Sequence, residues 1–299
     1  MSTNEILPDI PAPVAHPSKP IFGLPSLSCD AHAHVFGSYE HYPFSHLRDY
    51  TPPVTPLEQY IKMLKQLGFG RAVLVQPSVY GVDNCCMLDA LKKARKQRVD
   101  VELRGVAVIS EDTSDNELLD MREIGVKGVR INLLYKGADS HLQQVKRLIK
   151  KIEPLGWHIQ FLIDISQTPE IFNLISDSPI PIVFDHCGHF PTSLGTTHSS
   201  FKNFIALLQE KNTWVKLSGP NRITSLDKIP FTDVIPIAQL LIENAPDQLV
   251  FGTDWPHVKL KTTMPDDGAL VDELYTWTRG NTDTLQKVLV DNPARLYGF

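Results

Sequence analysis

Short apolar runs alternate along this chain with longer stretches in which apolar residues recur at helical spacing. A run such as Ala72–Val75 contains no polar residue, which is typical of a parallel strand buried on both faces. Eight short runs rich in apolar or β-branched residues follow one another through the sequence and predict eight strands. The predicted strands are Leu27–Val35, Arg71–Gln76, Glu102–Ile109, Val126–Leu133, Trp157–Ile163, Pro181–His186, Trp214–Ser218 and Leu249–Asp254.

The segments between these runs indicate amphipathic helices, because their apolar positions repeat every three or four residues. Strict alternation of strands and helices predicts a parallel α/β sheet, and a count of eight favours a closed (β/α)8 TIM barrel. An open doubly wound sheet would require a glycine-rich first turn, and neither GxGxxG nor GxxxxGK occurs. The predicted helices include Pro56–Leu67, Asn84–Lys96, His141–Ile152, Ser200–Glu210 and Pro236–Glu243.

The N-terminal region differs from the rest of the chain. Residues 1–25 are rich in proline and have no periodic segment, which predicts an extended arm on the surface. Residues 26–299 are expected to form one barrel domain. With 299 residues, of which 42% are hydrophobic, the chain is long and apolar enough to bury a full core.

Charge and targeting signals narrow the range of partners. The formal net charge of −5 argues against nucleic acid and membrane surfaces, which select proteins with a basic excess. The sequence has neither an apolar stretch that could span a membrane nor the pattern of a secretory signal, so we expect a cytoplasmic protein. The cysteines fit neither a disulfide framework nor a CxxC zinc pattern. We therefore expect reduced, small core residues at Cys29, Cys85, Cys86 and Cys187.

Polar residues capable of chemistry gather where the predicted strands end. The first strand contains His32 and His34, which the two-residue period of a strand places on one face. His186 ends the sixth strand and Asp254 the eighth, and functional residues of parallel barrels lie at such ends. Three imidazoles and a carboxylate suit one divalent metal such as Zn²⁺, although metal-independent acid/base catalysis could use the same groups. Asp254 is a plausible general base in either case.

Several motifs together resemble the amidohydrolase superfamily, and within it the lactonase-like branch that includes 2-pyrone-4,6-dicarboxylate lactonases. The resemblance extends over nearly the whole chain from about Ser26 and implies a TIM barrel of the amidohydrolase type. The motifs are Cys29–Gly37, Arg48–Pro52, Gln76–Ser78, Gly128–Asn132, Asp185 with His186, Leu217–Gly219 with Arg222, Gly252–His257 and Asn292–Phe299.

The resemblance also implies roles for the strand-end residues. Asp254 would activate the hydrolytic water, while His32, His34 and His186 would ligate a metal or polarise the substrate carbonyl. Many metal-dependent members add a histidine at the end of strand five. Here that strand has His158 near its start, where we expect a buried core residue, and Gln160 as a weak ligand. A binuclear centre is therefore not expected, and the resembling lactonases work without a metal.

Cationic residues near the strand ends favour an anionic substrate. Arg130 interrupts the fourth strand, Lys136 follows it, and Arg222 lies just beyond the seventh. Guanidinium groups bind carboxylates with two parallel hydrogen bonds, whereas a lysine acts as a point charge. Lys136 stands where the dicarboxylate lactonases have the second arginine of a pair. Lys216, on the seventh strand, has no role in this scheme.

Four further residues are expected to contact the substrate. By the resemblance, Tyr50 and Ser78 are neutral hydrogen-bonding contacts. His189 stands where the dicarboxylate lactonases are expected to carry arginine, so the substrate is expected to be related rather than identical. His257 follows Asp254 in its loop and could border the site.

These inferences predict a hydrolase that opens a carboxylated lactone, similar to 2-pyrone-4,6-dicarboxylate or to a related aromatic or sugar-acid catabolite. The alternatives are a Zn²⁺-dependent decarboxylase of the aminocarboxymuconate type, a sugar-acid lactone isomerase, and a catalytically silent barrel that binds a small acid. The expected partner is a small anionic molecule, and the sequence leaves a homo-oligomer open.

Overall fold

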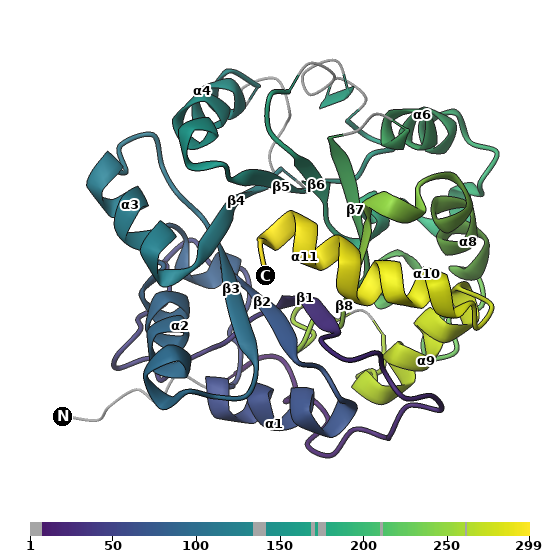
Figure 1. Cartoon of the computed structure of the whole chain (residues 1–299), viewed down its shortest axis with the longest axis horizontal. Coiled ribbons are helices and arrows are strands. Elements are labelled where there is room, and N and C mark those ends of the chain that lie inside the picture. The colour runs from purple at the N-terminus through teal and green to yellow at the C-terminus, as the bar shows by residue number, and fades with distance from the viewer. Residues whose placement is uncertain (1–7, 134–141, 169–170, 173–177, 210–211, 261) are drawn as a thin grey trace.

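The computed structural model describes residues 8–133, 142–168, 171–172, 178–209, 212–260 and 262–299. Its centre is a sheet of eight parallel strands in chain order (Figure 1). These strands coincide with the predicted runs, and only β7 begins outside its run, one residue early. The strands are β1 Cys29–Ala33, β2 Arg71–Val75, β3 Glu102–Ala107, β4 Val126–Asn132, β5 His158–Leu162, β6 Ile182–Phe184, β7 Thr213–Ser218 and β8 Leu249–Gly252.

The first and last strands meet and nearly close the sheet into a barrel. A parallel bridge joins Ala33 to Trp255, just beyond β8. The Asp30 carboxylate supports this seam, because its two oxygens accept hydrogen bonds from the backbone N–H and the hydroxyl of Thr253 at 2.9 and 2.6 Å. The predicted (β/α)8 barrel is therefore confirmed.

Helices surround the strands and alternate with them as predicted in the described part of the chain, and the segment between β5 and β6 lies largely outside the described residues. Their ends follow local signals, such as the capping box at the start of α3, in which Ser114 and Glu117 each bond the other's backbone N–H. None of the described helices is both long and apolar enough to span a membrane. The α-helices are α1 Leu57–Leu67, α2 Cys85–Gln97, α3 Asp115–Ile124, α4 Leu142–Ile152, α6 Ser199–Leu208, α7 Pro220–Ile223, α8 Ile235–Asn244, α9 Asp267–Trp277, α10 Thr282–Gln286 and α11 Asn292–Tyr297. Short 3₁₀ turns are η1 Ser78–Tyr80, η2 Glu153–Leu155, η3 His186–His189, η4 Thr192–Leu194 and η5 Pro246–Gln248, and η6 Lys287–Asp291 is a π-helical segment.

The barrel interior is apolar towards one end. Val73, Val106, Val183 and Val250, from four different strands, pack together with Tyr297 of α11. Figure 1 shows α11 lying across the middle of the ring of strands. Because apolar side chains fill this end, we expect the functional polar residues at the opposite end, where the carboxyl ends of the strands lie.

The proline-rich arm follows the surface of the barrel without forming a helix or strand between residues 8 and 28. Asp9 exchanges two hydrogen bonds with Thr51, one from its backbone N–H and one to its carboxylate. Further along, Ser18 bonds the carboxylate of Asp266 at the start of α9. The arm thus connects the loop before α1 with the last part of the barrel.

The cysteines depart in one position from the expected core placement. Cys29, Cys86 and Cys187 are buried free thiols, as expected. Cys85 is exposed, so its prediction as a core residue was wrong. It is the first residue of α2, and the apolar face of that helix begins only at the next residue, Cys86.

Candidate active site

A bulge in β1 directs His32 and His34 into the barrel. The pairing of β1 with β2 changes register between Asp30 and Ala33, and such a bulge re-aims the side chains around it. Asp30 points outward, where its carboxylate accepts a hydrogen bond of 2.9 Å from the Tyr60 hydroxyl of α1. The two imidazoles are therefore presented to the barrel mouth by a strand that is held from outside.

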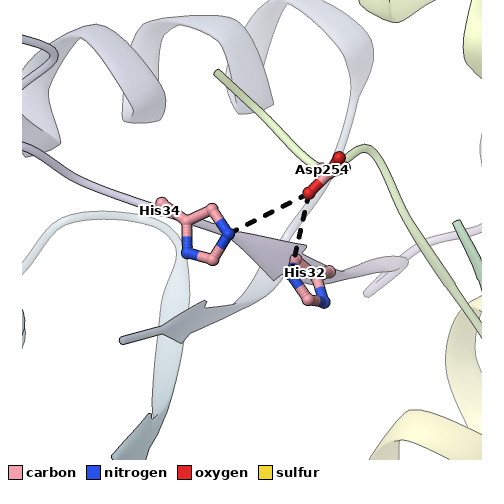
Figure 2. Close-up of side chains that lie close together, drawn as sticks. All are labelled: His32, His34 and Asp254. Carbon is pink, nitrogen blue, oxygen red and sulfur yellow. Dashed lines mark ion pairs between the residues drawn. The ribbon is translucent and has the colours of Figure 1, made fainter. Parts of the chain in front are cut away.

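Three ring nitrogens converge on one carboxylate oxygen at the mouth. The Nε2 atoms of His32, His34 and His186 lie 3.7, 3.9 and 3.8 Å from Oδ1 of Asp254. Figure 2 shows the imidazoles of His32, in β1, and of His34, directly after it, facing this carboxylate, and all four catalytic candidates have buried side chains. The structure thus brings together the four residues that the sequence predicts as catalytic or metal-binding.

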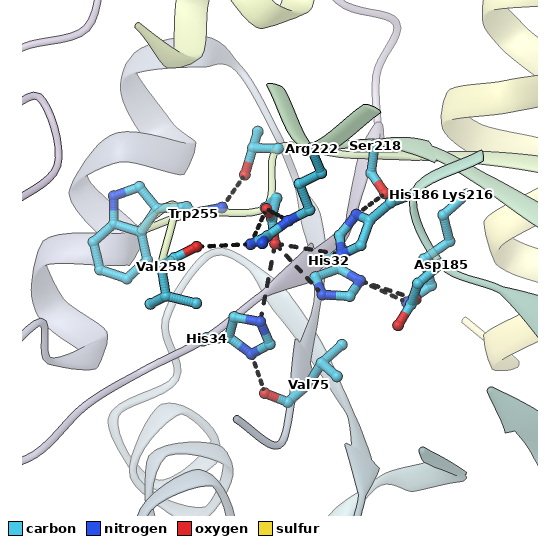
Figure 3. A network of polar contacts seen from close by, with 12 residues as sticks. His32, His34, Val75, Asp185, His186, Lys216, Ser218, Arg222, Trp255 and Val258 are labelled. Carbon is cyan, nitrogen blue, oxygen red and sulfur yellow. Dashed lines mark hydrogen bonds and ion pairs between the residues drawn. The ribbon is translucent and has the colours of Figure 1, made fainter. Parts of the chain in front are cut away.

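The outer nitrogens of the rings are held by neighbouring groups (Figure 3). Nδ1 of His34 lies 2.7 Å from the backbone carbonyl of Val75, and Nδ1 of His186 lies 2.9 Å from the Ser218 hydroxyl. Such contacts fix ring orientation and decide which nitrogen carries the proton. The inward-facing Nε2 atoms are therefore available for chemistry.

Asp254 has a constrained backbone and one engaged oxygen. Its φ of 67° is in the left-handed region, which is uncommon for residues other than glycine and recurs at functional sites. Nε and Nη2 of Arg222 each lie 2.6 Å from Oδ2. Oδ1 has no hydrogen-bond partner among the described residues. The carboxylate therefore has one oxygen held by a guanidinium group and one directed at the imidazoles.

Two glycines allow the strand ends to approach each other this closely. A Cβ atom on Gly252 would lie 2.6 Å from Cβ of His32, and one on Gly219 would lie 2.6 Å from Nδ1 of His186. Neither distance is compatible with a side chain, so the backbone of His32 and the imidazole of His186 each pack directly on a glycine.

The donor set suits a divalent cation. His32, His34 and Asp254 form one group of potential ligands, and His32, Asp185 and His186 form a second. Nε2 of His32 and Oδ1 of Asp254 are buried without a hydrogen-bond partner in the described part of the chain. Imidazole nitrogen and carboxylate oxygen are ligands that Zn²⁺ accepts. These residues could therefore hold one metal ion.

Burial keeps the imidazoles neutral. It lowers the pKa of His34 and of His186 well below the usual value. The pKa of His32 is lowered to about 4, first by burial and then by the nearby charge of Lys216. Neutral imidazoles can ligate a metal or exchange a proton with a substrate, depending on the tautomer.

Asp185 lies at the site, although the sequence analysis names it only as part of a motif and gives it no role. It is fully buried at the end of β6, and its Oδ2 accepts hydrogen bonds from Nε of Arg130 at 2.9 Å and Nε2 of Gln160 at 3.0 Å. Its Oδ1 lies 3.2 Å from Nδ1 of His32. Burial acts to raise the Asp185 pKa, but the contact with His32 and the charges of Arg130 and Lys216 hold it well below its usual value. An acidic residue directly before His186 at a strand end was the available signal.

Both predicted arginines lie at the site, and both contact carboxylates of the protein. Arg130 is bound to Asp185, as Arg222 is to Asp254. Burial raises the pKa of Tyr50 to about 12, an effect moderated by the Ser78 hydroxyl and by the charges of both arginines. Tyr50, Ser78 and the two guanidinium groups therefore share one region of the mouth.

The other residues that the sequence analysis considers near the site have different surroundings. His189 packs edge-on against His186, with ring centroids 5.2 Å apart. His257 is fully buried, and its Nε2 lies 2.9 Å from Oδ1 of Asp267, so its ring is engaged with the start of α9. Lys136 falls outside the described residues. His158 is buried in β5 against Tyr297, at the end of the barrel opposite the site.

A parallel barrel whose mouth carries a His-x-His strand, a later histidine and a carboxylate after the last strand is the architecture of a hydrolytic amidohydrolase-type enzyme. This chain belongs to the amidohydrolase family, whose model matches residues 29–299. The resemblance drawn from the sequence motifs is thereby confirmed.

Curated relatives of this chain include lactone hydrolases. The 2-pyrone-4,6-dicarboxylate hydrolase of Comamonas testosteroni is 36% identical over 95% of this chain and 94% of its own length. A 4-sulfomuconolactone hydrolase of Rhizobium radiobacter is 34% identical, with 98% and 97% covered. Among solved structures, one described as a probable 2-pyrone-4,6-dicarboxylic acid hydrolase of Acinetobacter baumannii, with citric acid bound, superposes with a TM-score of 0.79. It is 25% identical, and the match covers 91% of this chain and 100% of that one.

Proposed function

We propose that this protein hydrolyses an anionic lactone by attack of water on the ester carbonyl, with Asp254 as the general base. The observation that carries the proposal is the convergence of three imidazole Nε2 atoms on one oxygen of Asp254, within 3.9 Å and shielded from solvent. One site then contains a base, groups that can polarise a carbonyl, and cations that can bind the acidic groups of a substrate.

The asymmetry of Asp254 assigns the proton transfer to one oxygen. Oδ2 is saturated by two donors from Arg222, so Oδ1 is the oxygen that takes a proton from water. The water oxygen bonds to the carbonyl carbon, and the carbonyl electrons move onto its oxygen. When the ester C–O bond breaks, the leaving oxygen takes the proton back from Asp254. Water is thus added across the ester bond without net consumption of a protein group.

The histidine cluster would stabilise the negative charge that develops on the carbonyl oxygen. A neutral imidazole that carries its proton at the inward Nε2 and is preorganised in a buried site can donate to such an oxygen without reorganising during the reaction. If His32, His34, His186 and Asp254 hold a divalent cation, that ion would supply Lewis-acid polarisation of the carbonyl. The carboxylate and the imidazoles are oriented by the same neighbours in either case.

The anionic character of the substrate is supported by charge and by the relatives. Arg130 and Arg222 both lie near Tyr50, so the mouth contains two guanidinium groups and a phenol. The two curated relatives described above are named for lactones with acidic groups, a dicarboxylate and a sulfonate. A small lactone with one or two acidic groups therefore fits the site best.

The test is to follow acid release and products with a panel of carboxylated and sulfonated lactones. We expect a ring-opened acid as the sole product, with no carbon dioxide and no isomeric lactone. Asp254→Asn keeps the side-chain shape but removes its basicity, so kcat should fall by roughly 10² or more. Asp89→Asn, which alters an exposed carboxylate of α2, is the matched control and should leave kcat unchanged. Release of carbon dioxide, or normal turnover by Asp254→Asn, would contradict the proposal.

A further inference from the structure

The three imidazoles at the site have different partners at their outer nitrogens. For His34 the partner is the carbonyl of Val75, which can only accept, so Nδ1 carries the proton and Nε2 keeps its lone pair. For His186 the partner is the Ser218 hydroxyl, which can donate or accept. Nδ1 of His32 differs from both, because a lysine ammonium lies beside it.

Lys216 reaches this position from β7 through the barrel interior and is fully buried. Its Nζ donates to the backbone carbonyl of Ala31 at 2.9 Å and lies 3.2 Å from Nδ1 of His32 with hydrogen-bond geometry. An ammonium group has three donors and no acceptor, so in this contact Nδ1 must be the acceptor. An imidazole that accepts at Nδ1 carries its proton at Nε2.

Asp185 is the competing partner of the same nitrogen. Its Oδ1 lies 3.2 Å from Nδ1 of His32 and would favour a proton there. This oxygen has no hydrogen-bond partner with acceptable geometry among the residues that are described, whereas Oδ2 receives Arg130 and Gln160. Oδ1 is also 3.6 Å from Nζ of Lys216, so the lysine offsets the charge of Asp185 as well. Geometry and charge therefore both favour Lys216 as the group that decides the proton position.

We propose that Lys216 is a positioning residue that holds His32 as the Nε2–H tautomer, so that His32 donates a hydrogen bond into the site and resists binding a cation. The inference rests on the proposed function for the use of that donor, which would be the lactone carbonyl. His34, with a free Nε2 lone pair, has the opposite role. Two histidines of one His-x-His strand are thus made chemically unequal by their outer partners.

The first test reads the tautomer directly and needs no substrate. The protein is labelled with ¹⁵N-histidine, and long-range ¹H–¹⁵N spectra are recorded without added metal, with the His32 signals assigned through His32→Gln. We expect His32 to be protonated at Nε2 and His34 at Nδ1. Protonation of His32 at Nδ1 in the unaltered protein would overturn the proposal. In Lys216→Met the His32 proton should move to Nδ1, facing Asp185.

The second test measures Zn²⁺ affinity by competition with a chelator. Lys216→Met frees the His32 Nε2 lone pair, so Zn²⁺ should bind about tenfold more tightly or better, in line with the effect of outer partners on metal sites. Ser218→Ala is the matched control, because it removes the outer partner of His186 without affecting His32. It should weaken Zn²⁺ binding. Equal affinities of the unaltered protein and Lys216→Met would overturn the proposal.

The two proposals fail separately. If no lactone is hydrolysed but His32 carries its proton at Nε2, the proposed function is wrong and the role of Lys216 stands. If Lys216→Met does not fold, the spectrum of the unaltered protein still decides the tautomer, and Asp185→Asn gives a second variant. Because Asp185 loses the competition for Nδ1, that substitution should leave the His32 tautomer unchanged, and a change would contradict the proposal.

Discussion

Arg222 binds a single oxygen of Asp254 through two nitrogens, with Nε and Nη2 each 2.6 Å from Oδ2. Nη2 also donates to the backbone carbonyl of Val258, 3.1 Å away, so the guanidinium group ties the carboxylate to the loop that follows it. The sequence predicts Arg222 as a substrate contact. In the structure its guanidinium group holds the Asp254 carboxylate in place.

Removing Arg222 should therefore lower stability as well as activity. Arg222→Met leaves the buried Asp254 carboxylate without its guanidinium partner, and the free energy of unfolding should fall by about 3 kcal/mol. The double variant Arg222→Met/Asp254→Asn has no charge to compensate and should recover most of this loss. Urea unfolding of the two single variants and the double variant measures the coupling. Strictly additive effects would show that the pair does not stabilise the fold.

Arg130 should form an ion pair with a carboxylate of the substrate. Arg130→Ala should reduce kcat/KM for a carboxylated lactone by an amount equivalent to about 2–4 kcal/mol, the range for charge-assisted pairs. The loss should vanish for the methyl ester of the same lactone. Gln160→Met is the control, because it removes the other donor to Oδ2 of Asp185 and should affect both substrates equally. Equal losses with Arg130→Ala would instead mean that Arg130 acts through Asp185.

His158 should make the protein sensitive to acid. Burial lowers the pKa of His158 to about 3, compared with 6.5 for the free side chain. The folded protein holds the ring neutral while the unfolded chain takes up a proton below about pH 6.5, so acidification favours unfolding. The stability that this group contributes is fully present above about pH 6.5 and is lost as the pH falls towards 3. Relative to His158→Phe, the unaltered protein should lose about 2 kcal/mol between pH 7.5 and pH 5.

The measurement is urea unfolding of both proteins at several pH values. His158→Phe can differ in absolute stability, since the new ring must pack against Tyr297, but only the pH dependence of the difference tests the prediction. A difference that is constant from pH 7.5 to pH 5 would mean that the folded protein also accommodates the protonated ring.

The N-terminal arm should support substrate binding from a distance. The Asp9 carboxylate accepts a hydrogen bond of 2.7 Å from the backbone N–H of Thr51, the neighbour of Tyr50. Loss of one such bond costs about 1 kcal/mol, so Asp9→Ala should raise KM roughly fivefold and leave kcat within a factor of two. Ser18→Ala removes an arm contact at α9 instead and should leave KM unchanged. Steady-state kinetics with one lactone distinguishes the two variants.

The architecture was predictable from the sequence because it depends on local periodicity. Each strand lies in a short run rich in apolar residues, and the placement of His32 and His34 at one strand end and Asp254 at another follows from strand geometry. Once the strands are known to be parallel, their ends must meet at one rim. The sequence therefore indicates which residues share the mouth of the barrel.

The contacts between these residues were not predictable, because they depend on the stagger of neighbouring strands and on local backbone shape. The link from Lys216 to His32 joins β7 to β1, and no periodicity specifies how far each side chain reaches across the barrel. His257 turns towards Asp267 because its loop has a left-handed backbone, with φ of 63°, which a strand pattern does not encode.

The seam between β1 and β8 has a consequence for how this protein can change over evolutionary time. Asp30 fastens Thr253 on the outer side of β1, and two residues later the same strand presents His32 to the inside. Thr253 in turn directly precedes Asp254. A substitution at Asp30 is therefore expected to alter the spacing of His32 and Asp254, the pair proposed to be catalytic, as well as the closure of the barrel. On this strand, selection for stability and selection for catalytic activity therefore act on the same residues. A substitution that changes one of these properties is expected to change the other.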